Sequence, residues 1–282
     1  MTPRFLAHLS DIASDYDALL CDAWGVIHDG VRVFAGVDEA LTRFRATRGP
    51  VIVLTNAPRP NDIIPPQLDR LGLSRGAYDG VVTSGDATRA SILTFLPKPA
   101  YKLGPDKDEA LYRGIDVSFA PLEQAEFIIC TGLVDDAHET PDDYSDLLSR
   151  AAALGLTMIC ANPDMVVRWA GRLVYCAGAL AQTYERLGGA VIYGGKPHEP
   201  IYRLALARLS ETAGREIDAG RALVIGDGAA TDIAGANAHG FDALYVAHES
   251  GVHEGAIDGA AVSAALGAAG AHARFWTTAL RW

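Results

Sequence analysis

Residues 18–26, ALLCDAWGV, place an aspartate directly after a short run of apolar residues. Such a run is typical of a parallel strand that is covered by helices on both faces of its sheet. Open parallel sheets bind ligands at the carboxyl ends of their strands, which is where Asp22 stands. The stretch therefore predicts a buried strand and a candidate functional carboxylate at its end.

Strand and helix patterns alternate along the rest of the chain. Further apolar runs predict strands at 51–54, 80–83, 127–130, 156–160, 190–193, 222–225 and 243–246. Helical patterns lie at 36–48, 61–71, 86–95, 141–154, 200–214 and 231–239. This alternation favours an α/β fold with a doubly wound parallel sheet.

The length of 282 residues suits one large or two modest domains. No repeat and no low-complexity linker divides the chain, so a second domain would be an insertion. Pro97-Lys98-Pro99 and Tyr193-Gly194-Gly195 are the predicted hinges. We expect a core of residues 1–97 and 193–282, with a smaller α/β domain of residues 98–192 inserted in it.

Composition and charge narrow the class of protein and its partners. The chain is 49% hydrophobic and 21% charged, an ordinary globular mixture. A net charge of −11 disfavours nucleic acid and anionic membranes as partners. Four cysteines beside apolar residues, without a C-x-x-C pair, predict buried thiols in a reducing compartment. We find no pattern of a signal peptide or membrane span, so the predicted location is cytoplasmic.

Polar side chains also follow later strands. Thr55 and Asn56 end the second expected strand, and Asp227 ends a later one, with Asp232 one helical turn beyond it. Lys196 stands in a Gly-Gly-Lys-Pro segment ahead of a helix. Carboxylates that converge repel each other unless a cation lies between them, and hard oxygen ligands suit Mg²⁺ beside a phosphate. A carboxylate can also act as a covalent nucleophile.

Together these segments resemble the four ordered motifs of the haloacid dehalogenase (HAD) superfamily. The matching residues are Asp22-x-Trp24-Gly25-Val26, Thr55-Asn56, Lys196 and Gly226-Asp227-x-x-x-x-Asp232. The layout is similar to class IIA, the NagD-like and p-nitrophenylphosphatase group, in which a cap domain is inserted between the Thr-Asn motif and the lysine. The resemblance covers nearly the whole chain and implies a Rossmann-like HAD core with a class IIA cap.

The resemblance also implies a role for each matched residue. Four groups are expected to hold Mg²⁺: Asp22, which is also the nucleophile, Asp227, Asp232 and the backbone carbonyl of Trp24. Three residues are expected to bind the phosphoryl group: Thr55, Asn56 and Lys196, which also orients Asp22. In the cap, relatives contact substrate at positions that match Asn162, Asp164 and residues 178–180. The implied function is a phosphatase that acts on a small phosphorylated metabolite through an aspartyl-phosphate on Asp22, and a homodimer formed through the cap is a further expectation.

Trp24 departs from the pattern, because phosphatases of this superfamily carry an aspartate there that protonates the leaving alcohol. General acid–base help is typically worth about 10²–10⁴-fold. Three interpretations stay open: His28 or Asp29 substitutes, the leaving group needs no proton, or the reaction is not phosphate hydrolysis. A dehalogenase-like hydrolase and a degenerate member that binds a phosphorylated ligand without turnover are the alternative functions. Arg59 could reach a substrate anion, but a solvated position is the favoured interpretation.

Overall fold

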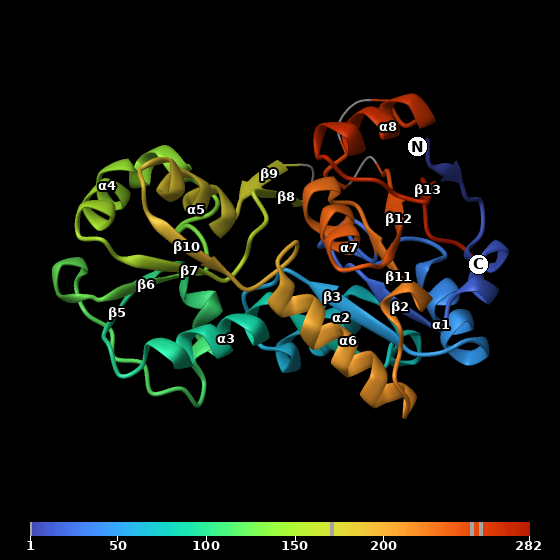
Figure 1. Ribbon diagram of the computed structural model, residues 1–282, viewed down its shortest axis with the longest axis horizontal. Helices are drawn as coiled ribbons and strands as arrows, with labels where there is room; N and C mark the ends of the chain where they lie inside the picture. Colours follow the sequence, from blue (N-terminus) through green and yellow to red (C-terminus); the bar gives the residue numbers. More distant parts are fainter. Residues whose placement is uncertain (1, 170–171, 249–250, 254–255) are drawn as a thin grey trace.

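The computed structural model describes residues 2–169, 172–248, 251–253 and 256–282. Figure 1 shows a larger lobe that contains both chain termini and a smaller lobe on the opposite side. A seven-stranded sheet lies in the larger lobe and a four-stranded sheet in the smaller one, and a two-stranded hairpin lies between the lobes. None of the described helices is both long enough and apolar enough to cross a lipid bilayer.

The larger sheet is wholly parallel and has the strand order β1-β13-β12-β11-β2-β3-β4. Its strands are β1 (Arg4–Phe5), β2 (Ala18–Cys21), β3 (Val51–Thr55), β4 (Gly80–Thr83), β11 (Ala222–Gly226), β12 (Asp242–Val246) and β13 (Phe275–Thr277). The chain adds β3 and β4 on one side of β2, then β12 and β13 on the far side of β11. The strand order therefore reverses between β2 and β11, and ligands of doubly wound sheets bind at such a point.

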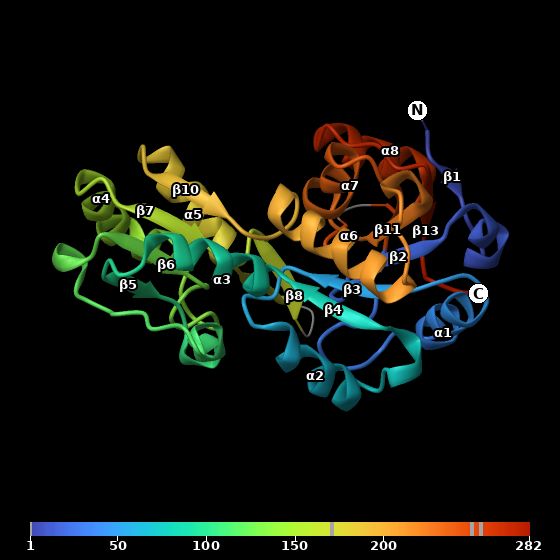
Figure 2. The same ribbon diagram turned by 60° about the horizontal axis from the view of Figure 1, so that its bottom comes forward.

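Helices cover both faces of this sheet, as Figure 2 shows. One face carries α1 (Val37–Thr47) and α2 (Ile64–Leu71), and the other carries α6 (Glu199–Ala213), α7 (Ala234–Ala238) and α8 (Gly259–Ala268). Successive residues of β2 alternate between the faces: Leu19 packs with Phe44 of α1, and Leu20 with Ile201 of α6. All four residues of β2 are buried, which explains its continuous apolar run and confirms the predicted fold class.

The smaller sheet is also parallel, in the order β10-β7-β6-β5. Its strands are β5 (Ala100–Leu103), β6 (Phe127–Cys130), β7 (Thr157–Cys160) and β10 (Ala190–Tyr193). Helices α4 (Ser145–Ala153) and α5 (Ala177–Arg186) cover one face, and α3 (Ser84–Phe95) lies on the other, where Ile92 packs with Phe127. Because α3 precedes the first predicted hinge, the division at residues 97/98 and 192/193 stays a prediction.

Two smaller features depart from or extend the expected elements. The predicted helix at 231–239 is present but begins earlier, with one wider helical turn at Ala229–Ile233 that continues directly into α7; the Asp232 carboxylate accepts the Gly228 N–H at 3.1 Å. The hairpin between the lobes consists of β8 (Val166–Trp169) and β9 (Arg172–Tyr175), paired antiparallel, and was not predicted. All four cysteines are buried and free, as the sequence predicted for thiols.

Candidate active site

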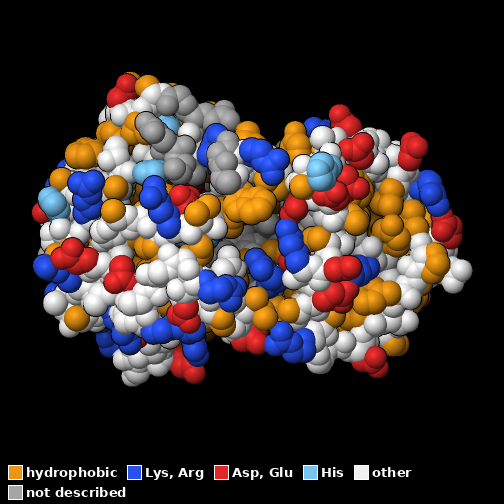
Figure 3. All heavy atoms as spheres, turned by 180° about the vertical axis from the view of Figure 1, so that it is seen from behind, with side chains coloured by type: hydrophobic (Ala, Val, Ile, Leu, Met, Phe, Trp, Pro, Cys, Tyr) orange, Lys and Arg blue, Asp and Glu red, His pale blue; other side chains and the backbone are white. Residues whose placement is uncertain are grey.

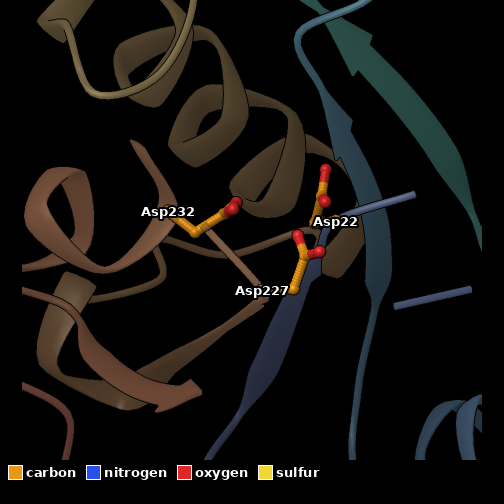
Figure 4. A group of neighbouring side chains, drawn as sticks. All are labelled: Asp22, Asp227 and Asp232. Carbon is orange, nitrogen blue, oxygen red and sulfur yellow. The ribbon is translucent and has the colours of Figure 1, made fainter. Parts of the chain in front are cut away.

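Three buried carboxylates converge where the strand order reverses. Asp22 follows β2, and Asp227 and Asp232 follow β11; Figure 4 shows the side chains turned toward one another. One carboxylate oxygen from each lies within 4.8 Å of the others. The Asp22 N–H donates to the Ile225 carbonyl at 2.8 Å, which holds the ends of the two strands together. The sequence predicted this cluster, and the structure brings its three members together.

Lys196 is the cation that faces this cluster. Its Nζ donates to Asp22 Oδ1 at 2.6 Å, to Asp232 Oδ1 at 2.7 Å and to the Leu54 carbonyl at 3.2 Å. The side chain is only 2% exposed, so all three ammonium hydrogens are used inside the protein. One ammonium cannot balance three carboxylates, so the donor set fits a further cation with a preference for oxygen.

Burial dominates the titration of these groups. It raises the pKa of Asp22 well above its ordinary value, against the attraction of Lys196. Burial and the charge of Asp232 raise the pKa of Asp227 to about 7. Burial opposes the charge of Lys196, but Asp22 and Asp232 hold its pKa well above the usual range. The lysine therefore stays charged, and a further cation would favour the ionised carboxylates of Asp22 and Asp227.

The loop after Asp22 lies directly against Asp227. Gly25 has a φ of +82°, and a Cβ placed on it would stand 2.0 Å from Asp227 Oδ2. Glycine suits both the positive φ and this close approach. The Val252 N–H donates to the same carboxylate oxygen at 2.9 Å. The loop therefore runs beside the cluster, where the backbone carbonyl of Trp24 is predicted to serve as a ligand.

Asn56 and Thr55 at the end of β3 play different parts. The Asn56 Oδ1 accepts from the Lys196 N–H at 2.7 Å, and its Nδ2 donates to the Lys196 carbonyl at 3.2 Å and to Asp164 Oδ1 at 2.8 Å. The amide is thus fully engaged in tying the lysine segment and the cap to the core. The Thr55 hydroxyl accepts from the Ala57 N–H at 3.2 Å and keeps its hydrogen free to donate. The Thr55 hydroxyl, rather than the Asn56 side chain, is therefore free to donate to a bound ligand.

Two cavities meet at this site. The first, about 250 Å³, is lined by the three carboxylates, Lys196, Thr55 and part of the β8–β9 hairpin. The second, about 310 Å³, extends between the lobes and is lined by aromatic, apolar and charged side chains. The cavities share four residues: Trp24, Thr55, Asp164 and Val167. We call them the acidic chamber and the outer chamber.

Several side chains of the outer chamber were not singled out from the sequence, and one was expected elsewhere. Trp169 and Tyr175 of the hairpin and Lys107 of the cap line it. Arg59 lines it as well, with its Nε 3.7 Å from Asp108 Oδ1, so the interpretation of Arg59 as a solvated residue is wrong. The loop after Asn56 turns beneath the cap, and that turn leaves the Arg59 side chain 27% exposed. Asn162, predicted in the cap, also lines this chamber.

Trp24 joins the core to the hairpin. Its Nε1 donates to the Arg168 carbonyl in β8 at 3.0 Å, and the Arg168 Nε donates to the Gly251 carbonyl at 3.3 Å. The indole ring also packs edge-on against His28, with ring centroids 5.1 Å apart. The residue that departs from the superfamily pattern therefore serves as a contact that holds the hairpin over the site.

His28 and Asp29, the predicted substitutes for the missing acid, line neither chamber. His28 is 2% exposed, its Nδ1 accepts the Gly30 N–H at 3.1 Å, and burial lowers its pKa to about 4. The Asp29 carboxylate accepts the N–H groups of Val31 and Arg32 in an exposed turn. The structure does not bring either residue to the reacting groups, because the loop folds them behind Trp24.

The Trp24 contact leads to a prediction about motion. Trp24→Phe keeps the ring packing but removes the hydrogen bond to the Arg168 carbonyl, worth about 1 kcal/mol. We expect amide hydrogen exchange in β8 and β9 to accelerate about fivefold, while α4 in the same lobe keeps its wild-type rate. Equal rates in the hairpin of both proteins would show that this bond does not hold the hairpin.

Comparisons with known proteins match two separate parts of the chain. A haloacid dehalogenase-like hydrolase family model matches residues 19–118, and a HAD-hydrolase-like model matches residues 193–266. A solved hydrolase of the haloacid dehalogenase-like family from Brucella suis 1330 is 41% identical, with a TM-score of 0.89, and the match covers 98% of this chain and 100% of that one.

A curated relative has a named activity. The D-glycerol 3-phosphate phosphatase of Mycobacterium tuberculosis is 29% identical over 245 residues, which cover 84% of this chain and 65% of that protein. The chain thus spans less than two thirds of the length of this relative. The solved glycerol phosphate phosphatase from M. tuberculosis in complex with magnesium is 25% identical, with a TM-score of 0.62, over 86% of this chain and 70% of that one. The fold, the ordered motifs and the match over the entire Brucella chain place this protein in the haloacid dehalogenase-like hydrolase family.

Proposed function

We propose that this protein is a Mg²⁺-dependent phosphatase that acts on a small phosphorylated metabolite through an aspartyl-phosphate on Asp22. The observation that carries the proposal is the acidic chamber, in which a buried aspartate is bonded to a buried lysine and faces two further carboxylates. The relatives named as phosphatases, one of them solved with magnesium, support it. A halide-releasing site would have no use for the two additional carboxylates, so they favour phosphoryl transfer over the dehalogenase-like alternative.

Asp22, Asp227, Asp232 and the Trp24 carbonyl would hold the ion, which would neutralise their charge and that of the phosphoryl oxygens. Lys196 holds Asp22 by a 2.6 Å hydrogen bond and presents its carboxylate to the chamber. Asp22 then attacks phosphorus, while the Thr55 hydroxyl donates to a phosphoryl oxygen. Fixed donors of this kind stabilise charge in the transition state without reorganisation.

The outer chamber would take the part of the substrate that leaves. It adjoins the acidic chamber through four shared lining residues and is lined by both core and cap. The surface in Figure 3 is hollowed between the lobes, and Lys and Arg side chains gather around the hollow. These charges would attract a phosphorylated substrate despite the net charge of −11. Dimerisation through the cap and a cytoplasmic location stay predictions.

Magnesium binding should appear as a change of stability with pH. The pKa of Asp227 is about 7 in the fold against 3.8 ordinarily, so its proton stabilises the metal-free protein fully below about pH 4. That stabilisation is lost as pH rises through 7. We expect the melting temperature of the metal-free protein to fall between about pH 4 and pH 7, and Mg²⁺ to restore it at neutral pH. At about 100 times its Kd, Mg²⁺ would add about 2.7 kcal/mol.

Asp227→Asn provides the test for this metal site. The variant keeps an oxygen that can accept the Val252 N–H but has no titrating carboxyl. It should reduce the acid-to-neutral fall in melting temperature by the contribution of Asp227, leaving that of Asp22, and abolish the Mg²⁺ shift. Hydrolysis of p-nitrophenyl phosphate by the wild type should also stop when a chelator is added. A Mg²⁺ shift that persists in Asp227→Asn would place the ion elsewhere, and binding of phosphate ligands without turnover would favour the degenerate, non-catalytic alternative.

A further inference from the structure

We propose that Asp164 of the cap is the general acid and base of this site, the task that related phosphatases assign to an aspartate at the position of Trp24. The inference rests on the proposed phosphatase function. It concerns a residue that the sequence indicated merely as a substrate contact.

The first argument is position. Asp164 lines both the acidic chamber, with Asp22 and Lys196, and the outer chamber. A phosphate monoester has its phosphorus in the acidic chamber, beside Asp22, and its leaving group in the outer chamber. The oxygen that joins them must therefore lie at the junction, and the carboxyl of Asp164 stands there.

The second argument is that the carboxyl is held in place. Asp164 Oδ1 accepts from Asn56 Nδ2 at 2.8 Å, and the Asp164 N–H donates to Asn162 Oδ1 at 3.1 Å. The turn is also packed closely against the core: a Cβ on Gly195 would stand 2.7 Å from Pro163 Cδ. One oxygen of the carboxyl is engaged with Asn56, so the other is left to carry a proton. A fixed donor loses little entropy in the reaction.

The third argument is that the environment favours a protonated carboxyl before the reaction. Burial raises the pKa of Asp164, and the negative charge of Asp232 raises it further. The positive charge of Lys196 and the hydrogen bond from Asn56 lower this pKa, but burial is the largest effect. Four more charges line the outer chamber and are paired, Arg59 with Asp108 and Lys107 with Asp136. Each of these two cations therefore already has a carboxylate partner other than Asp164.

The proton balance is simple. Asp22 forms a bond to phosphorus as the bond to the leaving oxygen breaks, and Asp164 gives its proton to that oxygen, so an alcohol departs and a carboxylate remains. A water molecule then attacks phosphorus and gives one proton to Asp164 as the bond to Asp22 breaks. Inorganic phosphate leaves, and both aspartates return to their initial states.

Trp24 fits this arrangement as a positioning residue. Its indole bonds to the Arg168 carbonyl, four residues after Asp164, and helps to seat the hairpin that follows the Asn162-Pro163-Asp164 turn. In this protein the general acid would therefore be Asp164 in the cap. Trp24, at the position where related phosphatases carry that acid, would hold the cap in place. Proton transfer would therefore depend on the closed arrangement of the lobes.

Asp164→Asn tests the proposal, because asparagine can still accept from Asn56 but has no carboxyl proton. Wild type and variant are assayed with Mg²⁺ on p-nitrophenyl phosphate, which needs no proton on its leaving group, and on an alkyl phosphate, glycerol 3-phosphate. We expect kcat/KM to fall about 10²–10⁴-fold for the alkyl ester and less than about tenfold for the aryl ester. Wild-type kcat/KM for the alkyl ester should fall as pH rises and Asp164 loses its proton, and the variant should not show this fall.

Asp146→Asn is the matched control: it makes the same change in charge on an exposed position of α4 in the same lobe and should leave both rates unchanged. An equal loss on both substrates would overturn the proposal and assign Asp164 to holding Asn56. A wild type that depends steeply on leaving-group pKa would overturn it even if the variant does not fold. No hydrolysis of the aryl ester by wild type would instead count against the phosphatase function itself.

Discussion

Asp22→Asn is expected to abolish turnover while leaving the fold intact. Loss of a covalent nucleophile costs on the order of 10⁶-fold in well-studied hydrolases, and we expect at least about 10³-fold here. Asparagine keeps an oxygen for the 2.6 Å bond from Lys196, so the buried ammonium is not left alone. The measurement is kcat on p-nitrophenyl phosphate with Mg²⁺, with circular dichroism to check folding.

Beryllium fluoride gives a second readout that does not depend on turnover. It mimics a phosphoryl group on a carboxylate, so it should raise the melting temperature of the wild type with Mg²⁺ and have no effect on Asp22→Asn. Asp11→Asn, which changes an exposed aspartate in a short helical turn, is the matched control and should behave like wild type. Wild-type activity in Asp22→Asn would exclude the aspartyl-phosphate.

The larger sheet was predictable because its strands are buried on both faces. Runs such as 18–21, 51–54 and 222–225 are continuously apolar, and each appears as a central strand of the sheet. Two of the strands that were missed, β1 and β5, lie at sheet edges. β1 is two exposed residues long, and β5, with the sequence AYKL, includes a lysine. Local pattern is weak where packing covers only one side of a strand.

Two helices and the hairpin were missed for other reasons. Helix α8 is built from alanine and glycine with little apolar contrast between its faces, and α5 begins Ala-Gly-Ala. The hairpin segments 166–169 and 172–175 are rich in β-branched and aromatic residues, and a glycine stands between them in the sequence, which is a recognisable hairpin signal. That signal is local, so it does not indicate that the hairpin covers the site.

The ordered motifs predicted the acidic chamber more fully than the outer one. Strand ends in a parallel sheet meet at one edge, so Asp22, Thr55 and Asp227 could be placed together from the chain alone. The outer chamber depends on how the cap sits on the core, which is a property of tertiary packing. For that reason Arg59 was interpreted as solvated, although it lines the outer chamber, and His28 was kept open as a substitute acid, although it lines neither chamber.

Lys196→Met is expected to cause a large loss of stability. Methionine fills a similar volume, but it leaves the buried carboxylates of Asp22 and Asp232 without their common partner. Removing one member of a buried ion pair typically costs about 3–5 kcal/mol, which in a chain of this size lowers the melting temperature by about 10 °C. The measurement is thermal unfolding of the metal-free protein at pH 7.

The pH dependence of that loss identifies its cause. Without the lysine, the pKa of Asp22 rises further above its ordinary value, so the uncharged carboxyl is favoured in the fold. When the pKa of a carboxyl is higher in the folded than in the unfolded protein, the free energy of unfolding decreases as pH rises toward that pKa. The gap between variant and wild type should therefore be small near pH 4 and widest at neutral pH. A gap independent of pH would indicate lost packing instead of an unpaired charge.

A double variant and a surface control separate these causes. Adding Asp22→Asn to Lys196→Met removes one of the two stranded charges and should restore part of the lost stability, since deleting both partners of a buried pair costs less than deleting one. Lys98→Met, the same change at an ion pair with Glu126 in which both side chains are more than half exposed, should cost less than about 1 kcal/mol. A double variant no more stable than Lys196→Met would show that the Lys196 ammonium is not the group that stabilises ionised carboxylates buried at this edge of the sheet.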